Sequence, residues 1–243
     1  MLPAIELEAV TVRYPGTPPA IALQDVTLRL YPGVTLVTGP PGAGKSTLLR
    51  VLATLLPPAS GEVRYPWGRA ATGAALPAGA AAEAPWAVRG LIGYVPQQGR
   101  VAGGLTVEAA LQYLAAVRAV VDHRGRARAL IARWGLSDVR ARPLDRVSGG
   151  QQRRWLLAQS RLNDPALWIL DEPARGLDYD GIRILREELA AYADAAARGE
   201  PRYAVLVDSE GRLHDLATAV VEVAAGRVAT RPFPPAQPVS AWH

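Results

Sequence analysis

The sequence predicts an α/β fold with a mostly parallel β-sheet, an N-terminal antiparallel β-subdomain and an inserted α-helical subdomain. Short apolar runs, which suit strands buried on both faces, alternate along the chain with helical patterns and so favour a parallel sheet. Residues 1–30 instead show the single-residue alternation of half-exposed strands. Residues from about 100 to 146 contain no strand pattern, so with the helix that follows we expect a helical subdomain at about 100–160.

Composition limits the classes of protein to which the chain can belong. Its 243 residues are 49% hydrophobic, enough for one large domain, which we place at residues 1–230. Residues 231–243 are rich in proline and are expected to form an extended or disordered tail. The absence of cysteine excludes disulfides, cysteine zinc sites and thiol nucleophiles. The net charge of +5 comes from scattered arginines, which suit solvated helix faces more than a nucleic-acid patch.

The sequence predicts no membrane span. It contains no uninterrupted apolar run of about 18 residues, the length that a spanning helix requires. Glu6 and Glu8 interrupt the start of the chain, where a secretion signal would need an apolar run. We therefore expect the chain to stay outside the bilayer, which is compatible with docking onto a protein that crosses it.

The first half of the chain alternates strands and a helix. The strands "IELEAVTVRY" and "IALQDVTLRL" come first, followed by the short apolar strand "GVTLVTG". The helical pattern of "KSTLLRVLATLL" stops at Pro57 and Pro58. Residues 69–87, rich in Ala, Gly and Pro, are expected to form a surface loop. "GLIGYVPQQG" predicts a further strand that ends at Pro96.

The second half begins with the helical insertion. Thr106 can cap a helix whose first turn holds Glu108, and one face of that helix is expected to comprise Val107, Leu111, Leu114, Val117 and Val121. A second helix is predicted at about Arg126–Trp134, ending at Gly135. "SGGQQRRWLLAQSRLN" opens another helix, and the apolar runs "ALWILDEP" and "RYAVLVD" predict buried strands that end in acidic residues.

The stretch "GPPGAGKS" fits the phosphate-loop pattern G-x-x-x-x-G-K-[ST], with a strand before it and a helix after it. Glycines let backbone N–H groups curl around a phosphate, and the helix N-terminus adds partial positive charge. Lys45 is the only lysine among 27 basic residues, and a compact ammonium fits such a loop better than a forked guanidinium. The alternative is a glycine-rich turn with an incidental lysine. The predicted binding residues are Gly39, Pro40, Pro41, Gly42, Ala43, Gly44, Lys45, Ser46 and Thr47.

Asp171 and Glu172 end the strand "ALWILDEP" and so lie at the carboxyl edge of the sheet, where ligands bind in such folds. Asp171 and the Ser46 hydroxyl are candidates to hold Mg²⁺. Glu172 is the candidate to orient and deprotonate an attacking water. Apolar strands that end in two acids are common, so this prediction depends on the phosphate loop upstream.

The stretch "VSGGQQRR", lying between the phosphate loop and "ILDEP", resembles the signature of the ATP-binding cassette (ABC) family of ATPases. The resemblance runs from Ile5 to about Val228 and implies a P-loop NTPase core, ATP and Mg²⁺ as ligands, and a dimer of cassettes. It also implies that a signature motif contacts the γ-phosphate of ATP held by a second cassette; here that motif is Ser148, Gly149, Gly150 and Gln151. Read alone, the same residues are a helix start with serine as the cap.

Three further positions match the family one at a time. Tyr14 corresponds to an aromatic residue that stacks on adenine, although it also suits a strand-edge surface position. Gln97 corresponds to a glutamine that reaches Mg²⁺ and water and senses the membrane partner, with Gln98 as the alternative if the register slips. Asp178 corresponds to an aspartate that couples the two sites of the dimer, although it also suits a turn.

One family position is not matched. Where the family has a histidine that contacts the γ-phosphate, at the end of the strand after "ILDEP", this chain has Ser209. His214 follows on the next helical segment and either faces elsewhere or is brought in by a shifted loop. Losing a positioned donor costs about 10²–10³ in rate, so the resemblance implies slow hydrolysis, or pairing with a non-identical cassette. Ser209 is the candidate to replace part of that function.

The order of the motifs resembles cassettes of ABC-2 type exporters. This implies a peripheral subunit at the cytoplasmic face of the cell membrane that pairs with a second cassette, identical or not, and with separate membrane subunits. The helical insertion and the Gln97 loop would form the groove that receives those subunits. Two alternatives are a soluble cassette acting on nucleic acid or in translation, and a phosphotransferase, which leaves "SGGQ" unexplained. We expect no direct contact with nucleic acid.

Overall fold

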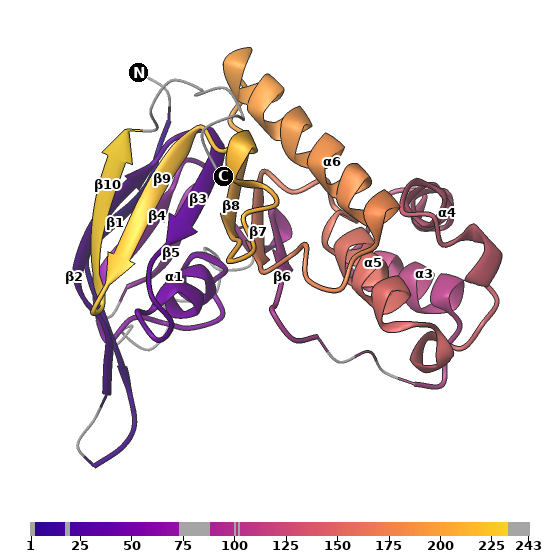
Figure 1. The fold of residues 1–243 in the computed structure, drawn as a ribbon, viewed down its shortest axis with the longest axis horizontal. Helices are drawn as coiled ribbons and strands as arrows, with labels where there is room; N and C mark the ends of the chain where they lie inside the picture. The colour runs from indigo at the N-terminus through magenta and orange to yellow at the C-terminus, as the bar shows by residue number, and fades with distance from the viewer. Residues whose placement is uncertain (1–2, 18–19, 73–87, 100, 102, 233–243) are drawn as a thin grey trace.

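The computed structural model describes residues 3–17, 20–72, 88–99, 101 and 103–232. Two sheets form its framework (Figure 1). The antiparallel sheet has the order β2–β1–β4–β5, with bounds Ala20–Leu30, Ile5–Tyr14, Ser60–Tyr65 and Gly68–Thr72. The larger sheet has the order β10–β9–β3–β8–β7–β6, with bounds Arg227–Pro232, Ala219–Ala224, Gly33–Thr38, Tyr203–Val207, Leu167–Asp171 and Ile92–Val95.

The larger sheet is parallel except for β10, which pairs antiparallel with β9. Together with the antiparallel N-terminal sheet, this confirms the predicted fold class. The helices are α1 (Lys45–Leu52), α3 (Val107–Val117), α4 (His123–Arg133), α5 (Gly149–Ser160) and α6 (Tyr179–Ala197). Figure 1 shows α3, α4 and α5 gathered at the end of the molecule away from the antiparallel sheet.

Alternation along the parallel strands divides the buried residues into two cores. On β7, Trp168 and Leu170 face one core, while Leu167 and Ile169 face the other. The first core also holds residues of α3, α4, α5 and α6, and the second holds residues of α1 and the antiparallel sheet. The parallel sheet is therefore covered on both faces, which is why its strands read as continuous apolar runs.

Helix α1 is shorter than predicted. It ends at Leu52 rather than running to the prolines, because Thr54 takes a left-handed conformation (φ 58°) and the Leu55 N–H donates back to Arg50 O at 2.9 Å. Two predictions of irregular structure are also wrong in part. Residues 69–72 belong to strand β5 and residues 231–232 to strand β10. Residues 73–87 and 233–243 lie outside the described part of the chain.

The Thr106 cap is confirmed, since its side chain accepts from Ala109 N at 3.1 Å. The predicted apolar face of α3 is wrong at its end: Val117 and Val121 are 65% and 91% exposed. The helix stops at Val117, so Val121 has left the face that its spacing suggested. Helix α4 begins earlier than predicted, because Asp122 caps it through Gly125 N at 3.1 Å.

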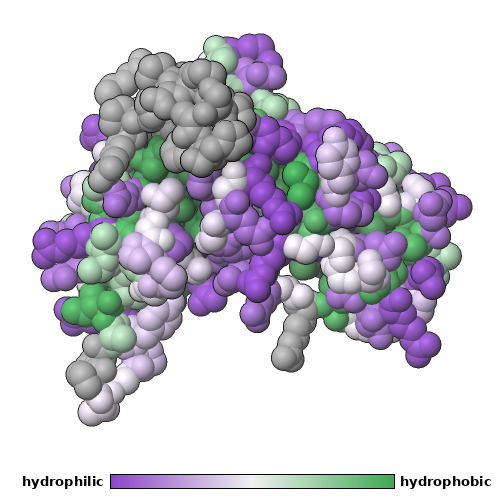
Figure 2. Space-filling model, viewed as in Figure 1, coloured by the Kyte–Doolittle hydropathy of each residue, from purple (hydrophilic) through white to green (hydrophobic). Residues whose placement is uncertain are grey.

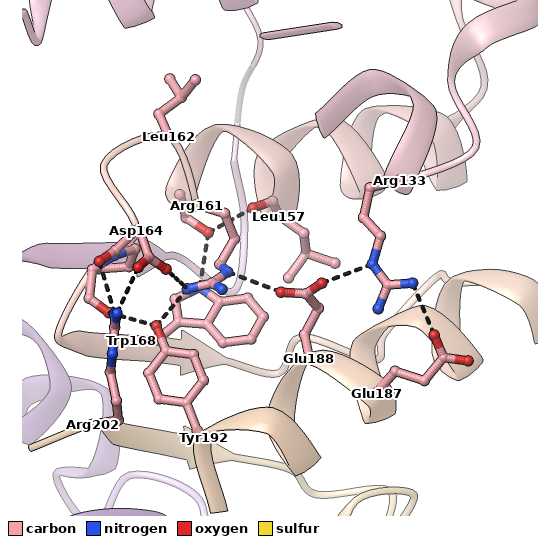
Figure 3. A network of polar contacts seen from close by, with 12 residues as sticks. Arg133, Leu157, Arg161, Leu162, Asp164, Trp168, Glu187, Glu188, Tyr192 and Arg202 are labelled. Carbon is pink, nitrogen blue, oxygen red and sulfur yellow. Dashed lines mark hydrogen bonds and ion pairs between the residues drawn. The ribbon is translucent and has the colours of Figure 1, made fainter. Parts of the chain in front are cut away.

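An ion-pair network fastens the helical region to the core (Figure 3). Arg133 of α4 pairs with Glu187 and Glu188 of α6 at 2.9 and 2.8 Å. Arg161, at the end of α5, reaches Glu188 at 3.0 Å and the Tyr192 hydroxyl at 2.6 Å. Helices α4 and α5 are thus joined to one edge of α6, which itself packs against the sheet. None of the described helices has both the length and the apolar character needed to cross a membrane.

Candidate functional site

The phosphate loop connects β3 to α1 and is shaped by its glycines. Gly39 and Gly44 have φ of 137° and 109°, conformations that side chains rarely adopt. A Cβ at Gly44 would lie 2.5 Å from Ala22 O, and one at Gly39 would overlap Val223 O, so both positions exclude larger residues. Gly42 also has positive φ, but open space surrounds its missing Cβ.

Lys45 folds back over the loop. Its ammonium donates to Gly39 O at 2.6 Å and to Pro40 O at 2.9 Å. Gly44 is the N-cap of helix α1 and offers no side-chain cap, and the first turn of the helix holds no acidic residue. The first N–H groups of α1 and a lysine therefore converge on one loop, an arrangement that attracts an anion.

Asp171 lies at the end of β7 and is 3% exposed. Burial raises the pKa of its carboxyl, while a hydrogen bond from the Ser46 hydroxyl opposes that shift. The structure thus brings the predicted metal-binding hydroxyl and carboxylate together. Hydroxyl and carboxylate oxygens are the ligands that Mg²⁺ prefers, so Ser46 and Asp171 fit this ion.

Glu172 is 8% exposed and takes a left-handed conformation with φ of 51°. Its N–H donates to Val207 O of β8 at 2.9 Å, which continues the strand pairing past the end of β7. Its carboxylate is held by one residue: Ser209 N donates to Oε2 at 3.0 Å and Ser209 Oγ donates to Oε1. Ser209, at the unmatched family position, therefore lies against the candidate base.

His214 does not take the place of the histidine that the family has at the position of Ser209; its side chain contacts its own loop. It begins the short 3-10 helix η3 (His214–Leu216), and its Nε2 lies 2.8 Å from Asp208 O. Asp208 is itself buried and accepts from Leu213 N at 2.8 Å. The imidazole thus packs on its own loop, as expected for a residue that faces elsewhere.

Tyr14 lies beside the first turn of α1, with its hydroxyl 3.3 Å from Thr47 Oγ1. The Arg50 guanidinium on α1 donates hydrogen bonds to the hydroxyl oxygens of Tyr94, on β6, and of Tyr14, and these bonds raise the pKa of Arg50. The predicted adenine-stacking residue is therefore adjacent to the phosphate loop and tied to its helix. Its stacking on a base stays a prediction.

Gln97 and Gln98 follow β6 and have exposed side chains. Within the described residues no hydrogen bond fixes the Gln97 side chain, so its predicted contact with metal and water stays a prediction. The backbone just before it is fixed, because Pro96 O accepts from Arg153 Nη1 at 2.6 Å.

The signature residues form the start of α5. Ser148 Oγ accepts from Gln151 N at 3.2 Å and Gln151 Oε1 accepts from Ser148 N at 3.0 Å, a complete capping box. Ser148 and Gly149 are exposed, and open space surrounds the missing Cβ of Gly149. In the described residues no hydrogen bond joins this motif to the phosphate loop of the same chain.

Asp178 caps α6 by accepting from Gly181 N at 2.9 Å, and it pairs with Arg154 of α5. The Arg154 guanidinium lowers the pKa of the Asp178 carboxyl. The side chain stays 67% exposed, so one carboxylate joins the start of α6 to the second turn of α5 at the surface. Its predicted role between two sites is untested by this geometry.

Sequence reasoning missed two arginines that organise the site. Arg50 joins Tyr14 to Tyr94, and Arg153 reaches the carbonyls that surround Glu172. The only sequence signal for Arg153 is its place two residues after the signature, in a helix where an arginine would normally be read as exposed. The contacts of Arg153 follow from its burial, which the local spacing of residues does not predict.

The model of the family described as ABC transporter matches residues 23–175. The chain belongs to the ABC transporter family. The zinc import ATP-binding protein ZnuC of Pasteurella multocida is 35% identical to it over 185 residues, which are 74% of this chain and 59% of the relative. ZnuC of Halorhodospira halophila is 38% identical over 185 residues, with 72% and 58% covered. The cassette thus spans about three fifths of the length of these relatives.

Solved structures share the fold. The dimeric ATP-binding cassette MJ0796 in a post-hydrolysis state, bound to ADP and Pi, aligns with a TM-score of 0.77 and 23% identity. The alignment covers 94% of this chain and 98% of that one. A second structure, of the ATP-binding subunit of an ABC transporter, aligns with a TM-score of 0.75 and 23% identity over 96% of this chain and 90% of that one. The predicted exporter subclass is not confirmed, since the curated relatives are named for zinc import.

Proposed function

We propose that the cassette binds and hydrolyses ATP and powers transport through separate membrane subunits. One observation supports this most: the phosphate loop, the Ser46–Asp171 pair and the Ser209–Glu172 pair meet at the carboxyl edge of one parallel sheet. Anion-binding amides, a metal-binding pair and a candidate base are what phosphoryl transfer to water requires.

The phosphates of ATP lie, in this proposal, on the amides at the start of α1, and Lys45 exchanges the carbonyls of its own loop for phosphate oxygens. Ser46, Asp171 and Gln97 would hold Mg²⁺, which would supply positive charge against the phosphates. Glu172 orients a water and accepts its proton as the oxygen bonds to the γ-phosphorus and the bond to the β–γ bridging oxygen breaks. Ser209 keeps the Glu172 carboxylate in place.

The reaction centre is completed by a second cassette. Ser148 and its neighbours form an exposed, self-capped helix start with no bond to the phosphate loop of their own chain. Such a helix start suits a phosphate that another molecule presents. One of the solved structures that share the fold, the ATP-binding cassette MJ0796, is dimeric, which supports pairing of two cassettes. Asp178, at the adjoining start of α6, lies where it would meet the partner.

The membrane partner is proposed to dock between the helical region and the core. A cleft of about 400 Å³ opens there, lined by Ala53, Thr54, Leu55, Arg89, Ile92, Tyr94 and Arg118. Leu55 within the cleft is an exposed large apolar residue, and so are Tyr113 and Val117 of α3, the helix that ends directly before Arg118. Figure 2 shows that hydrophilic residues otherwise cover much of the surface over the helical region. In this proposal the cassette lies at the cytoplasmic face of a membrane as a peripheral subunit.

The names of the relatives support import of a zinc ion, in place of the export that the order of motifs suggested. Cargo selection belongs to the membrane subunits in either case, because the proposed role of this chain is to deliver the energy of ATP. Growth on limiting zinc, in cells that carry or lack the cassette, tests the direction. Loss of zinc uptake supports import, whereas retained uptake with loss of efflux of another compound contradicts it.

The central experiment measures ATP turnover and association of the purified chain. Wild-type protein should hydrolyse ATP with Mg²⁺, whereas Glu172→Gln should bind ATP, turn over at least about 100-fold more slowly and accumulate as an ATP-dependent dimer. Lys45→Ala serves as the control that binds ATP poorly and stays monomeric. A Glu172→Gln protein that binds ATP yet hydrolyses it at the wild-type rate contradicts the proposal.

A further inference from the structure

Arg153 of α5 is buried to 6% exposure without an acidic partner at hydrogen-bond distance among the described residues. Its guanidinium instead donates to backbone carbonyls of two separate segments. Burial lowers the pKa of this arginine, and the nearby carboxylates of Asp171 and Glu172 oppose that shift. A buried guanidinium that gives its donors to carbonyls of separate segments holds those segments in place relative to one another, because buried donors require partners.

The first segment is the turn that carries the candidate base. Arg153 Nη2 donates to Asp171 O at 2.9 Å and to Glu172 O at 2.6 Å, and Nε donates to Pro173 O at 3.3 Å. These three successive carbonyls surround the left-handed Glu172. A left-handed conformation persists only where its surroundings hold it, so Arg153 fixes the turn and thereby the direction of the Glu172 side chain.

The second segment is the loop that carries Gln97. Arg153 Nη1 donates to the carbonyl directly before Gln97 at 2.6 Å. One helical turn further along α5, Leu156 packs against the same loop, where a Cβ at Gly99 would lie 2.5 Å from Leu156 Cδ1. Residues three apart share a helix face, so one face of α5 holds this loop from both sides of Gln97.

We propose that Arg153 is a positioning residue that joins the signature helix to the Gln97 loop and to the Glu172 turn. A shift of α5 then moves all three together, so that Ser148, Gln97 and Glu172 take their working positions in one step. This inference rests on the proposed function of the cassette and adds to it the element that coordinates its parts. Only a planar fork can reach both segments at once, so a lysine, whose donors share one nitrogen, cannot replace it.

Arg153→Lys tests the inference, with Arg161→Lys as the matched control. Arg161 ends the same helix, is also largely buried, and uses its fork on Glu188 and Tyr192 in the network of Figure 3, away from the site. Turnover is measured per bound nucleotide, so that unfolded molecules do not count. Arg153→Lys should lower kcat about 10- to 100-fold with KM for ATP within about threefold, whereas Arg161→Lys should leave both near wild type and lower only thermal stability.

A double substitution tests the connection to the loop. If Arg153 acts through Gln97, then Arg153→Lys together with Gln97→Ala lowers kcat by clearly less than the product of the two single effects. Arg161→Lys with Gln97→Ala should give the product. The inference is overturned if Arg153→Lys hydrolyses ATP within about threefold of wild type, or if its effect multiplies with that of Gln97→Ala. A wild-type chain that binds but does not hydrolyse ATP contradicts the proposed function instead.

Discussion

The starts of α1 and α5 are both glycine-containing helix N-termini proposed to face phosphate, yet they are completed differently. At α1 no side chain caps the helix, and the Lys45 ammonium is bound to carbonyls of its own loop. At α5 a serine and a glutamine close a full capping box. The first backbone N–H groups of α1 have no side-chain acceptor, whereas at α5 the Ser148 and Gln151 side chains accept from backbone N–H groups.

This difference indicates an order of assembly. An uncapped helix start gains most from a bound anion, so the α1 loop is where nucleotide binding should supply stability. A self-capped start is stable before any ligand arrives and can present a formed surface to a partner. In the proposed function, the α1 loop is thus stabilised by its bound nucleotide, whereas the start of α5 is already formed before it contacts the partner cassette.

The largest expected effect separates the two glycines. Gly44→Ala forces a Cβ towards Ala22 O at a residue with φ of 109°, so ATP affinity should fall on the order of 100-fold. Gly149→Ala enters open space on a helix, where alanine is favoured, so ATP affinity should stay within about threefold of wild type. Equilibrium ATP binding measures both, and equal losses in the two variants would refute the comparison.

A second substitution separates capping from phosphate contact at α5. Aspartate caps helices as well as serine does, but its charge repels a phosphate. Ser148→Asp should therefore keep the unfolding free energy of wild type while turnover falls about 100-fold. Ser148→Ala is the counterpart: it should lose about 1 kcal/mol of stability, seen in denaturant unfolding. Normal turnover in the aspartate variant would show that no phosphate meets this helix.

A third change concerns the candidate reaction centre beside the α1 loop, where Ser209 donates to the Glu172 carboxylate. Ser209→Ala removes the hydroxyl donor and leaves the N–H donor at 3.0 Å, so kcat should fall about tenfold. Ser209→Thr keeps the hydroxyl and should restore most of the rate. Ser209→His reinstates the family residue and should raise turnover above wild type; an unchanged rate in steady-state kinetics would contradict the account of slow hydrolysis.

The smallest effect is a gain in stability at Asp171. Because burial raises its folded pKa, ionisation disfavours the folded state as the pH rises above about 3.9, the usual value in unfolded chains. Asp171→Asn should therefore melt at a higher temperature than wild type at pH 7 without nucleotide, and lose turnover. The difference in melting should vanish at pH values well below about 3.9, where the Asp171 carboxyl is protonated in the folded and the unfolded chain alike. The exposed Asp180→Asn should show neither effect, and a less stable Asp171→Asn would refute the reasoning.

Local rules were sufficient for several parts of this molecule. The Thr106 cap, the phosphate loop, the helix that opens with the signature residues and the strand ending in Asp171 depend on residues close together in sequence, and each was predicted correctly as structure. Residues 69–72 were misread as loop because a strand formed by small residues depends on pairing with β4, which no local pattern records. Val117 was misread because helical spacing does not say where packing against the core ends.

The amino-acid sequence by itself determined the fold class and the identity of the groups that can bind phosphate and metal. The spacing of the glycines, the one lysine and the two carboxylates at the end of β7 act through local geometry, which the sequence records. The tertiary structure alone decided which of those groups meet. It placed Ser209, not His214, on Glu172, and it buried Arg153 between two segments that lie far from it along the chain. Such contacts depend on how strands and helices pack across long sequence separations, and spacing within one segment carries no record of that packing.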